Sequence, residues 1–542
     1  MLYRTTLGMR LEMTARSGQI LRLVAAFVAA SILSNVALLD FYIRNANELD
    51  SPARVVRYAE IVIVVVALIS GLIKLLRPQF ALWRILLAVG AAAFVFFSYD
   101  QGKGLPRRLA WGGEEWFAIA WIAVTIAAGL IALVSLHRPA SVSVILVLSI
   151  AIIAPSGVRA FASLAKSRGA ATSSNELVAS DSRNRISPNI YWIVLDGYPR
   201  RDVLKENFGF DNGRFLQALD ALDFTVLENS LSNFPATIYS ISSTLSMDYV
   251  VRTSGEGVEP FASSEIYPVV KGKSRVVSRL KAAGYNYVHF ENGYDYLTKC
   301  AAGEPRCVQG RGGLSELDVA ILSNTPLIDL VTDFEEITGK GDAHLFAWGG
   351  VDDLGAKLGE IQKTPAPFFV YAHVLAPHPP MRFRADCSAR PADPDLQAWD
   401  PAARPAFIDQ LRCTNAQTEI LLQRLVRSDP GAIVIVQSDH GTAFNGQFPK
   451  PPLDKPPTDW SDADLHERFG VLNAMRLPAE CRNKLRQDLT LVDTFPLVLS
   501  CLTGEEFERH QPRFFVTPYD NSPEFGVAIE YPADRVQASL GH

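Results

Sequence analysis

The stretch GAIVIVQSDHG (residues 431–441) joins a buried strand to side chains that can bind a metal. Residues 432–436 are all apolar, and a continuous apolar run of this length is typical of a strand that is covered on both faces. The run ends at Asp439 and His440, and Gly441 follows. Because carboxylate oxygen and imidazole nitrogen both suit zinc or manganese, the stretch predicts a central strand that ends in a metal site.

The chain on either side of this stretch alternates between helical and strand patterns. Short apolar runs occur in NIYWIVLDGY (residues 189–198) and in APFFVYAHVLAPHPP (residues 366–380). Residues 405–428 have the spacing of a long helix that leads into the first quoted strand. Helices that alternate with continuous apolar strands predict an α/β fold, with a mostly parallel sheet between two layers of helices.

Three predicted strands end in side chains that can bind a metal. Asp196 closes the strand near residue 190, and His373 and His378 lie at the end of the strand near residue 370. In open α/β sheets, sites form at the carboxyl ends of the strands. We therefore expect Asp196, Asp439 and His440 to lie close together. His373 lies within its strand, which favours a hydrogen-bonded core histidine.

A fourth stretch, NFPATIYSISSTL (residues 233–245), supplies a hydroxyl group. Pro235 suits the first position of a helix, and Thr237 is then in the first helical turn. The free N–H groups of a helix start favour an anion such as a phosphoryl group. Thr237 is the predicted nucleophile, because a neighbouring cation stabilises its alkoxide. The competing hydroxyls are those of Ser232, Ser240, Ser242 and Thr244.

The first 163 residues predict a membrane region. Five segments carry no charged residue, at 23–39, 61–73, 85–99, 116–136 and 140–158. A spanning helix needs about 20 mostly apolar residues. We expect five spans in residues 1–163, followed by a polar linker at 164–188; alternatively, one or two of the segments are buried core helices.

A net charge of −5 argues against nucleic acid as a partner.

Charge and cysteine patterns both predict where the domain after the spans lies. Basic residues at 4, 10 and 16 precede the first span and favour a cytoplasmic N-terminus. All six cysteines follow the membrane region, at 300, 307, 387, 413, 481 and 501, which suits an oxidising compartment. Cys300 with Cys307, and Cys387 with Cys413, could form disulfides; the alternative is six free thiols.

The motifs together resemble a known family. IYWIVLDGY, NFPATIYSISSTL, HVLAPHPPMRF, IVQSDHG and ERFGVLNA occur in this order within residues 186–505. The series resembles the alkaline phosphatase superfamily, in particular its membrane-anchored, sulfatase-like branch. That branch includes lipoteichoic acid synthases and phosphoethanolamine transferases. The resemblance implies a catalytic domain at 189–510, a C-terminal tail at 511–542, and a bacterial inner membrane with the catalytic domain on the periplasmic or extracellular side.

The resemblance also implies roles for residues. By it, Asp196, Thr237, Asp439 and His440 hold a divalent metal, zinc or manganese, as one or two ions. Thr237 is the nucleophile, and His378 helps to bind the substrate or a second metal. The implied enzyme is a metal-dependent phosphotransferase or phosphohydrolase that acts on phosphodiester head groups. Its partners are then the lipid bilayer and a phospholipid or surface-glycan substrate.

The chain departs from the resembled pattern in two places. Asp196 stands where the transferases have glutamate, and no full set of second-metal ligands is visible. His373 and His466 are the remaining candidates, although the position of His466 predicts an exposed helix residue. The segment CSARP at Cys387 differs in order and place from the sulfatase cysteine motif, so we do not expect a catalytic cysteine there. The alternatives are a sulfatase-type ester hydrolase and a non-catalytic envelope component; the oligomeric state is not predicted.

Overall fold

The computed structural model describes most of the chain, in two compact units. The described residues are 2–44, 53–108, 116–167, 187–254, 257–292, 298, 300, 306–310, 316–330, 350–390, 399–447, 455–517 and 528–538. One unit comprises Met1–Thr172 together with Leu317–Ile337, and we call it the membrane unit. The other comprises Ser173–Glu316 and Thr338–His542, and we call it the catalytic unit.

The membrane unit consists of helices. They are α1 (Leu2–Arg44), α2 (Ala53–Leu76), α3 (Leu82–Phe96), α4 (Tyr99–Arg108), α5 (Phe117–Ser135), α6 (Ser141–Ser167) and α13 (Glu316–Ser323). Among the described residues, three stretches are long and apolar enough to cross a membrane: Ser17–Tyr42, Arg54–Leu76 and Phe117–Ser135. The structure thus supports an N-terminal membrane region made of helices.

Among the described residues, the structure supports three of the five predicted spans. Helix α3 has only 15 residues, which gives a length of about 22 Å against a hydrocarbon core of about 30 Å. The predicted third span, 85–99, breaks at Phe97 and Ser98, where α3 ends and α4 follows. In α6, the described apolar stretch covers only Ser141–Ala154.

Helix α3 packs between α1 and α5 through small residues. A Cβ atom on Gly90 would lie 2.8 Å from Cα of Ala30, and one on Gly129 would lie 3.2 Å from Cβ of Ala92. Small residues let helix backbones approach closely, which favours association in lipid, where no hydrophobic force drives helices together. This packing holds α1, α3 and α5 together, and Val66 of α2 packs against α1 and α3.

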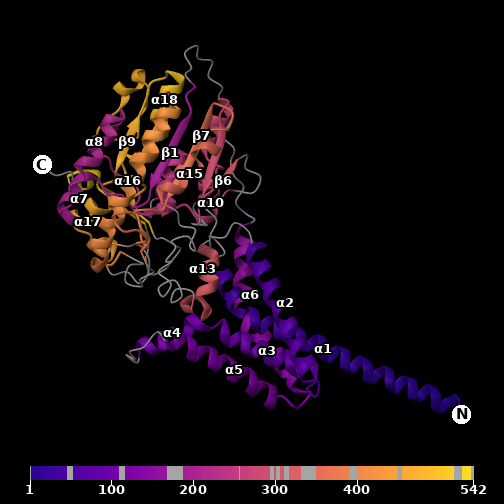
Figure 1. The fold of residues 1–542 in the computed structure, drawn as a ribbon. Helices are drawn as coiled ribbons and strands as arrows, with labels where there is room; N and C mark the ends of the chain where they lie inside the picture. Colours follow the sequence, from indigo (N-terminus) through magenta and orange to yellow (C-terminus); the bar gives the residue numbers. More distant parts are fainter. Residues whose placement is uncertain are drawn as a thin grey trace. The chain divides into compact units, whose positions relative to one another are not determined.

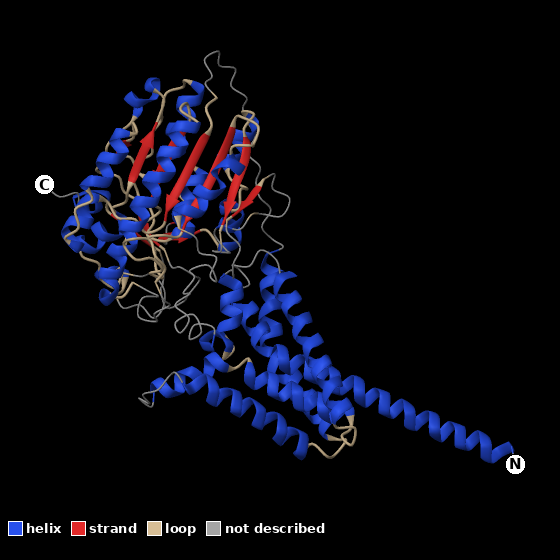
Figure 2. Cartoon of the chain, in the orientation of Figure 1, coloured by secondary structure: helices blue, strands red, loops and turns tan. Residues whose placement is uncertain are grey.

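The catalytic unit is built on a seven-stranded sheet with the order β2-β9-β8-β1-β7-β5-β6 (Figure 2). The strands are β1 (Ile190–Leu195), β2 (Thr225–Val226), β5 (Asn286–Glu291), β6 (Cys307–Gln309), β7 (Phe368–Val374), β8 (Ile433–Gln437) and β9 (Asn473–Arg476). Strands β8, β1, β7, β5 and β6 run parallel, while β9 and β2 are antiparallel to their neighbours. The predicted mostly parallel sheet is confirmed.

Helices cover both faces of the sheet (Figure 1). In β1, Trp192 belongs to the core on one face and Ile193 to the core on the other. The first face is covered by α9 (Thr237–Ser246), α11 (Arg275–Ala282) and α18 (Thr494–Thr503); the second is covered by α8 (Gly213–Ala221), α15 (Val351–Ile361) and α16 (Arg404–Ser428). Burial on both faces explains why the central strands are continuously apolar.

The remaining elements lie around this sheet. They are the helices α7 (Arg201–Phe208), α10 (Ser263–Val270), α17 (Asp462–Phe469) and α19 (Ala533–Ala538), and the strand pairs β3 (Val251–Ser254) with β4 (Gly257–Pro260) and β10 (Phe514–Val516) with β11 (Ile529–Tyr531). The two predicted disulfides, Cys300–Cys307 and Cys387–Cys413, are formed, whereas Cys481 and Cys501 are buried free thiols. The alternative of six free thiols is therefore wrong.

The chain after β8 passes against the end of α17, and Gly441 allows this contact. A Cβ atom on Gly441 would lie 1.9 Å from the backbone oxygen of Glu467. We expect Gly441→Ala to lower the free energy of unfolding of the catalytic unit by about 3 kcal/mol, because backbone must move to make room. Chemical denaturation of the full chain, followed by tryptophan fluorescence, measures the change.

Gly431→Ala is the matched control for this substitution, since Gly431 precedes the same strand and a Cβ there meets nothing within 4 Å. We expect the control to change stability by less than about 0.5 kcal/mol. Equal stability of the two variants would show that the close approach at Gly441 does not constrain the fold.

Candidate active site

The first element of the site is the end of β1. The backbone N–H of Asp196 donates to the carbonyl of Val374 at 3.0 Å, which continues the parallel pairing with β7 beyond the strand. Asp196 is 1% exposed. Gly197 has a φ of +67°, and a Cβ there would lie 3.0 Å from the Trp399 ring. The pairing and the glycine together bring the Asp196 carboxylate to the edge of the sheet.

The end of β8 supplies Asp439 and His440. The N–H of Gly197 donates to Oδ1 of Asp439 at 3.2 Å, and the N–H of Tyr198 donates to Oγ of Ser438 at 2.7 Å. Ser438 in turn donates to the carbonyl of His440 at 2.8 Å. These bonds tie the loop after β1 to the loop after β8. The two strand ends therefore form one rigid edge.

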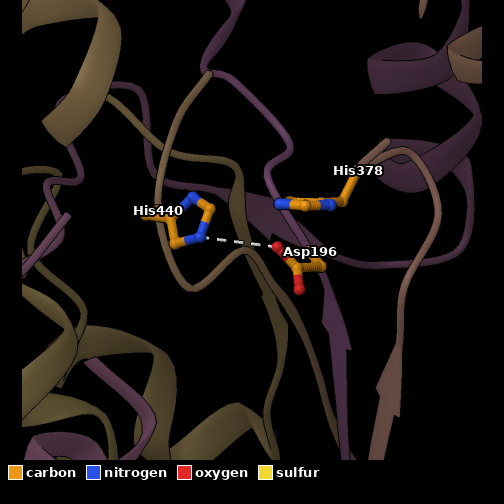
Figure 3. Close-up of side chains that lie close together, drawn as sticks. All are labelled: Asp196, His378 and His440. Atoms are coloured by element: carbon orange, nitrogen blue, oxygen red, sulfur yellow. Dashed lines mark ion pairs between the residues drawn. The ribbon is translucent and has the colours of Figure 1, made fainter. Parts of the chain in front are cut away.

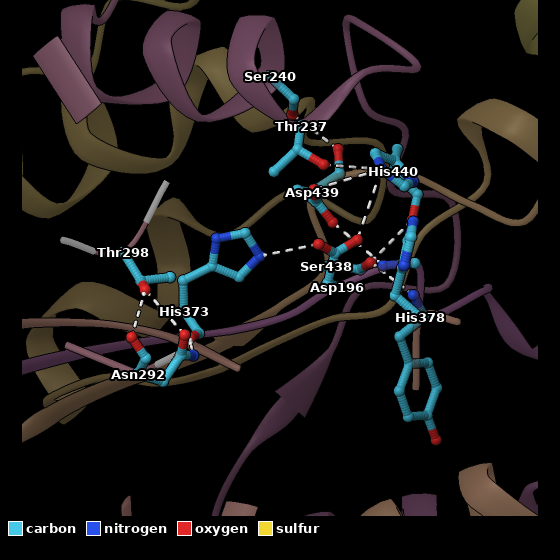
Figure 4. A network of polar contacts seen from close by, with 12 residues as sticks. Asp196, Thr237, Ser240, Asn292, Thr298, His373, His378, Ser438, Asp439 and His440 are labelled. Atoms are coloured by element: carbon cyan, nitrogen blue, oxygen red, sulfur yellow. Dashed lines mark hydrogen bonds and ion pairs between the residues drawn. The ribbon is translucent and has the colours of Figure 1, made fainter. Parts of the chain in front are cut away.

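Thr237 comes from the start of α9. The predicted place of Pro235 at the first helical position is wrong. Helix α9 begins at Thr237 itself, and Ala236 is its extended N-cap residue. The Oγ1 atom of Thr237 lies 3.0 Å from Nε2 of His440 (Figure 4). The helix start therefore places a hydroxyl group directly beside the side chains that could hold a metal.

The competing hydroxyl groups are directed elsewhere. Each donates to a backbone carbonyl: Ser232 to Phe234 at 3.0 Å, Ser240 to Asp439 at 2.6 Å, Ser242 to Ile266 at 3.4 Å and Thr244 to Ser240 at 2.9 Å. Their hydrogens are used to hold backbone in place, whereas the hydroxyl of Thr237 contacts an imidazole. This difference favours Thr237 over the alternatives.

His378, in the loop after β7, lies close to Asp196 and His440. One ligand atom each from Asp196, His378 and His440 lies within 4.8 Å of the others (Figure 3). The Nδ1 atom of His378 lies 2.6 Å from the Pro379 carbonyl, so it carries the hydrogen of that contact. The ring also meets Trp399 edge-on, with 4.9 Å between centroids. Nε2 of His378 is thus left to act toward the site.

His373 belongs to the site as well as to the core. It is 1% exposed on β7, and its Nε2 lies 3.2 Å from Oδ2 of Asp196. Asp196, His373 and Asp439 form a second group whose ligand atoms lie within 4.8 Å of one another. The sequence pattern indicated the burial of His373. Its partner follows only from the register, in which His373 pairs with Val194 of β1.

His466 lies elsewhere, and its predicted exposure is wrong. The residue is 6% exposed, and its Nε2 contacts Asp202 at 2.7 Å and Arg200 at 3.1 Å. Among the described residues it belongs to no group that could hold a metal. Its partners lie some 260 positions away in the sequence, so no local pattern announced the burial.

Arg468 is a neighbour of the site that the sequence analysis missed. Its guanidinium is fully buried, and Nη1 lies 2.5 Å from the Gly441 carbonyl and 3.3 Å from Nδ1 of His440. The motif ERFGVLNA contained this residue, but nothing local connects it with His440. Arg468 holds the backbone that follows the histidine.

Burial and neighbouring charge shift the pKa values of the site. Burial alone would raise the pKa of Asp196, but the adjacent histidines, His378 first, lower it below its ordinary value. Burial lowers the pKa of His440 to about 4. Burial also opposes the protonation of His373, yet its hydrogen bond to Asp196 raises the pKa above the ordinary value. His440 is therefore neutral and Asp196 ionised near pH 7.

The arrangement fits a divalent cation. Oδ1 of Asp196 and Oδ2 of Asp439 are buried and accept no hydrogen bond from the described residues. Both atoms lie 3.5 Å from Nε2 of His440. Because Nδ1 of His440 donates to the Gly441 carbonyl at 2.8 Å, Nε2 presents its lone pair to the same place. Two carboxylates and one neutral imidazole are a donor set that zinc and manganese accept.

A third group of potential ligand atoms does not fit a metal. Glu291, Cys300 and Cys307 lie within 4.8 Å of one another, but the two cysteines form a disulfide. Their sulfur atoms carry no thiolate charge, so they cannot act as metal ligands. Chemistry is therefore expected at the sheet edge and not at this group.

Several solved structures are similar to this chain at low sequence identity. The C-terminal periplasmic domain of EcEptC from Escherichia coli is similar at 14% identity and a TM-score of 0.41, over 65% of this chain and 96% of that one. Lipooligosaccharide phosphoethanolamine transferase A from Neisseria meningitidis is similar at 13% identity and a TM-score of 0.40, over 89% and 97% of the chains. The phosphonate monoester hydrolase of Agrobacterium radiobacter is similar at 13% identity and a TM-score of 0.37, over 61% and 80%.

Comparison with curated protein sequences finds no match. The sulfatase family, in contrast, matches residues 188–503, more than half of the chain. This range contains both strand ends, the start of α9 and the loop that carries His378. The resemblance that the motifs predicted is confirmed, and the chain belongs to the sulfatase family within the alkaline phosphatase superfamily.

Proposed function

We propose that the protein is a membrane-anchored, metal-dependent phosphotransferase or phosphohydrolase. It acts on phosphodiester head groups of the cell envelope, with Thr237 as the nucleophile. The observation that carries the proposal is the 3.0 Å contact between Oγ1 of Thr237 and Nε2 of His440, beside two buried carboxylate oxygens without hydrogen-bond donors among the described residues. Membership of the sulfatase family supports ester chemistry at this place.

Asp196, Asp439 and His440 are the proposed ligands of the divalent cation, and Thr237 completes the set. When bound, the cation stabilises the alkoxide of Thr237 and the charge that develops on the phosphoryl oxygens. His373 holds Oδ2 of Asp196, so that Oδ1 stays directed toward the cation. The start of α9 adds the positive end of a helix dipole beside the negative phosphoryl group.

The proposed reaction has two steps. In the first, Oγ1 of Thr237 loses its proton to solvent and forms a bond to phosphorus, while the bond from phosphorus to the lipid alcohol breaks. When both nitrogens of the His378 ring carry a hydrogen, Nε2 is placed to donate its proton to the leaving oxygen. In the second, an acceptor hydroxyl or water attacks phosphorus and Thr237 is released. A sugar hydroxyl gives transfer, and water gives hydrolysis.

The proposed location is the inner membrane of a bacterium, with several spans and the catalytic unit on the periplasmic side. Three stretches that could cross a membrane support the anchor. Two disulfides in the catalytic unit support an oxidising compartment. Such a location gives the site access to phospholipids and to surface glycans.

Removing the nucleophile tests the mechanism. We expect Thr237→Ala to lower the turnover of an aryl phosphodiester at least about a thousandfold, because no other hydroxyl among the described residues contacts the His440 ring. Thr237→Ser keeps the hydroxyl and retains measurable turnover. Thr244→Ala, on the same helix, is the matched control and leaves the rate unchanged. Full activity of the Thr237→Ala protein would eliminate the mechanism.

Metal removal tests the proposed ligands. We expect a chelator to abolish turnover and to lower the thermal unfolding midpoint, because the carboxylates of Asp196 and Asp439 then repel each other inside the protein. Adding back zinc or manganese identifies the metal that restores both. Asp439→Asn lowers the metal content of the purified protein, whereas Asp409→Asn on the surface of α16 does not. Unchanged turnover and unfolding after chelation would contradict metal dependence.

Paired esters distinguish the proposal from sulfate-ester hydrolysis. Sulfatases use an oxidised cysteine or serine, and this chain has threonine at the nucleophile position, so we expect turnover of an aryl phosphodiester but not of the aryl sulfate. Both rates are followed by release of the same phenol. Faster release from the sulfate would support the sulfatase alternative, and release from neither ester would support a non-catalytic envelope component.

A further inference from the structure

An apolar groove runs along three helices of the membrane unit. It has a volume of about 590 Å³ and is lined by α2, α3 and α5. Among its lining residues, Thr125 alone has a polar side chain. The lining of α2 runs from Ile61 to Ile73, a rise of about 18 Å, close to the thickness of one leaflet of a hydrocarbon core of about 30 Å.

One end of this groove meets a segment that comes from within the catalytic sequence. Residues Leu317–Ile337 group with the membrane unit, although the chain before and after them belongs to the catalytic unit. Leu317 and Ile321 pack with Leu38 of α1 and Val55 of α2 in a buried cluster. We call residues 316–330 the docking segment.

Two acidic residues fix the docking segment to the helices. Asp318 accepts a hydrogen bond from Tyr58 and lies 3.4 Å from Nη2 of Arg54, both at the start of α2. Asp329 accepts a hydrogen bond from Tyr99 and lies 2.6 Å from Nζ of Lys103, both on α4. Apolar packing and charge thus hold the segment at two separate points.

Both points lie at the same end of the groove. Tyr58 is one helical turn before Ile61, where the groove begins on α2, and Tyr99 is two residues after Phe97, the last groove residue beyond α3. Val62 lines the groove and also packs against the buried cluster that contains Leu317 and Ile321 of the docking segment. The groove is therefore continuous with the docking interface.

We propose that the groove binds one acyl chain of the phospholipid substrate, with the head group at the end where the docking segment lies. This inference rests on the proposed function and adds a lipid subsite to it. A flexible acyl chain can fill an irregular groove of aliphatic side chains, and it gains packing contacts there. The ion pairs of Arg54 with Asp318 and of Lys103 with Asp329 make this end of the groove polar, like the membrane surface at which a lipid head group lies.

The test uses the full chain in nanodiscs of phosphatidylethanolamine and phosphatidylglycerol. A phosphatidylethanolamine with a diazirine on one acyl chain is the probe, and mass spectrometry locates the labelled residues. We expect labels on the lining of α2, α3 and α5. Labels spread evenly over outward-facing positions of the helices, without enrichment on the groove lining, would overturn the proposal.

Two adjacent valines provide a matched pair of variants. Val65 lines the groove and is 44% exposed, whereas Val64 is 56% exposed and lies outside the lining. We expect Val65→Trp to fill the groove, reduce labelling and raise the KM for the lipid about tenfold, through lost packing of several methylene groups. Turnover of a soluble aryl phosphodiester stays the same. Val64→Trp changes neither quantity.

The labelling experiment and the turnover measurements together distinguish this inference from the proposed function. If both tryptophan variants bind and turn over lipid equally, the groove is not a lipid subsite, even where Thr237 is confirmed as the nucleophile. If the wild-type protein cleaves neither ester but labelling is confined to the groove and is lost in Val65→Trp, the acyl-chain site holds and the proposed function fails.

Discussion

The parallel pairing of β1 with β7 and β8 is the constraint on which the candidate site depends. Val194 pairs with His373 on one side and with Gln437 on the other. This register brings Asp196, His373 and Asp439 to one edge of the sheet. A slip of one residue would turn each of these side chains to the opposite face. The apolar contacts that fix the register, on both faces of the strands, therefore also fix the chemistry.

The same edge is costly for the folded protein. Asp196 and Asp439 are each 1% exposed, and burying two carboxylates near each other is unfavourable unless charge and hydrogen bonds compensate. His373 compensates one oxygen of Asp196, and the N–H of Gly197 compensates one oxygen of Asp439. The remaining oxygens face the lone pair of His440. A divalent cation bound at this point would stabilise an arrangement that is otherwise repulsive.

The sequence predicted those parts of the structure that local patterns determine. Continuous apolar strands that end in Asp196 or Asp439 predicted both the parallel sheet and the site at the carboxyl ends of its strands. Contacts between distant segments were not visible: the burial of His466 depends on Asp202, and the position of Arg468 depends on the loop after β8. The start of α9 differs from the prediction because proline tolerates several positions near a helix start. The break after α3 carries no local signal, so the sequence did not show that the third predicted span ends at residue 96.

The aspartate at position 196 is held in one orientation by the strand beside it. Its side chain is short and therefore has little freedom, and Nε2 of His373 on β7 lies 3.2 Å from its Oδ2. The N–H of Asp196 also continues the ladder with Val374, which keeps the backbone at the edge of the sheet. The orientation of the carboxylate is thus fixed, because one oxygen is anchored and only the other can turn toward a cation.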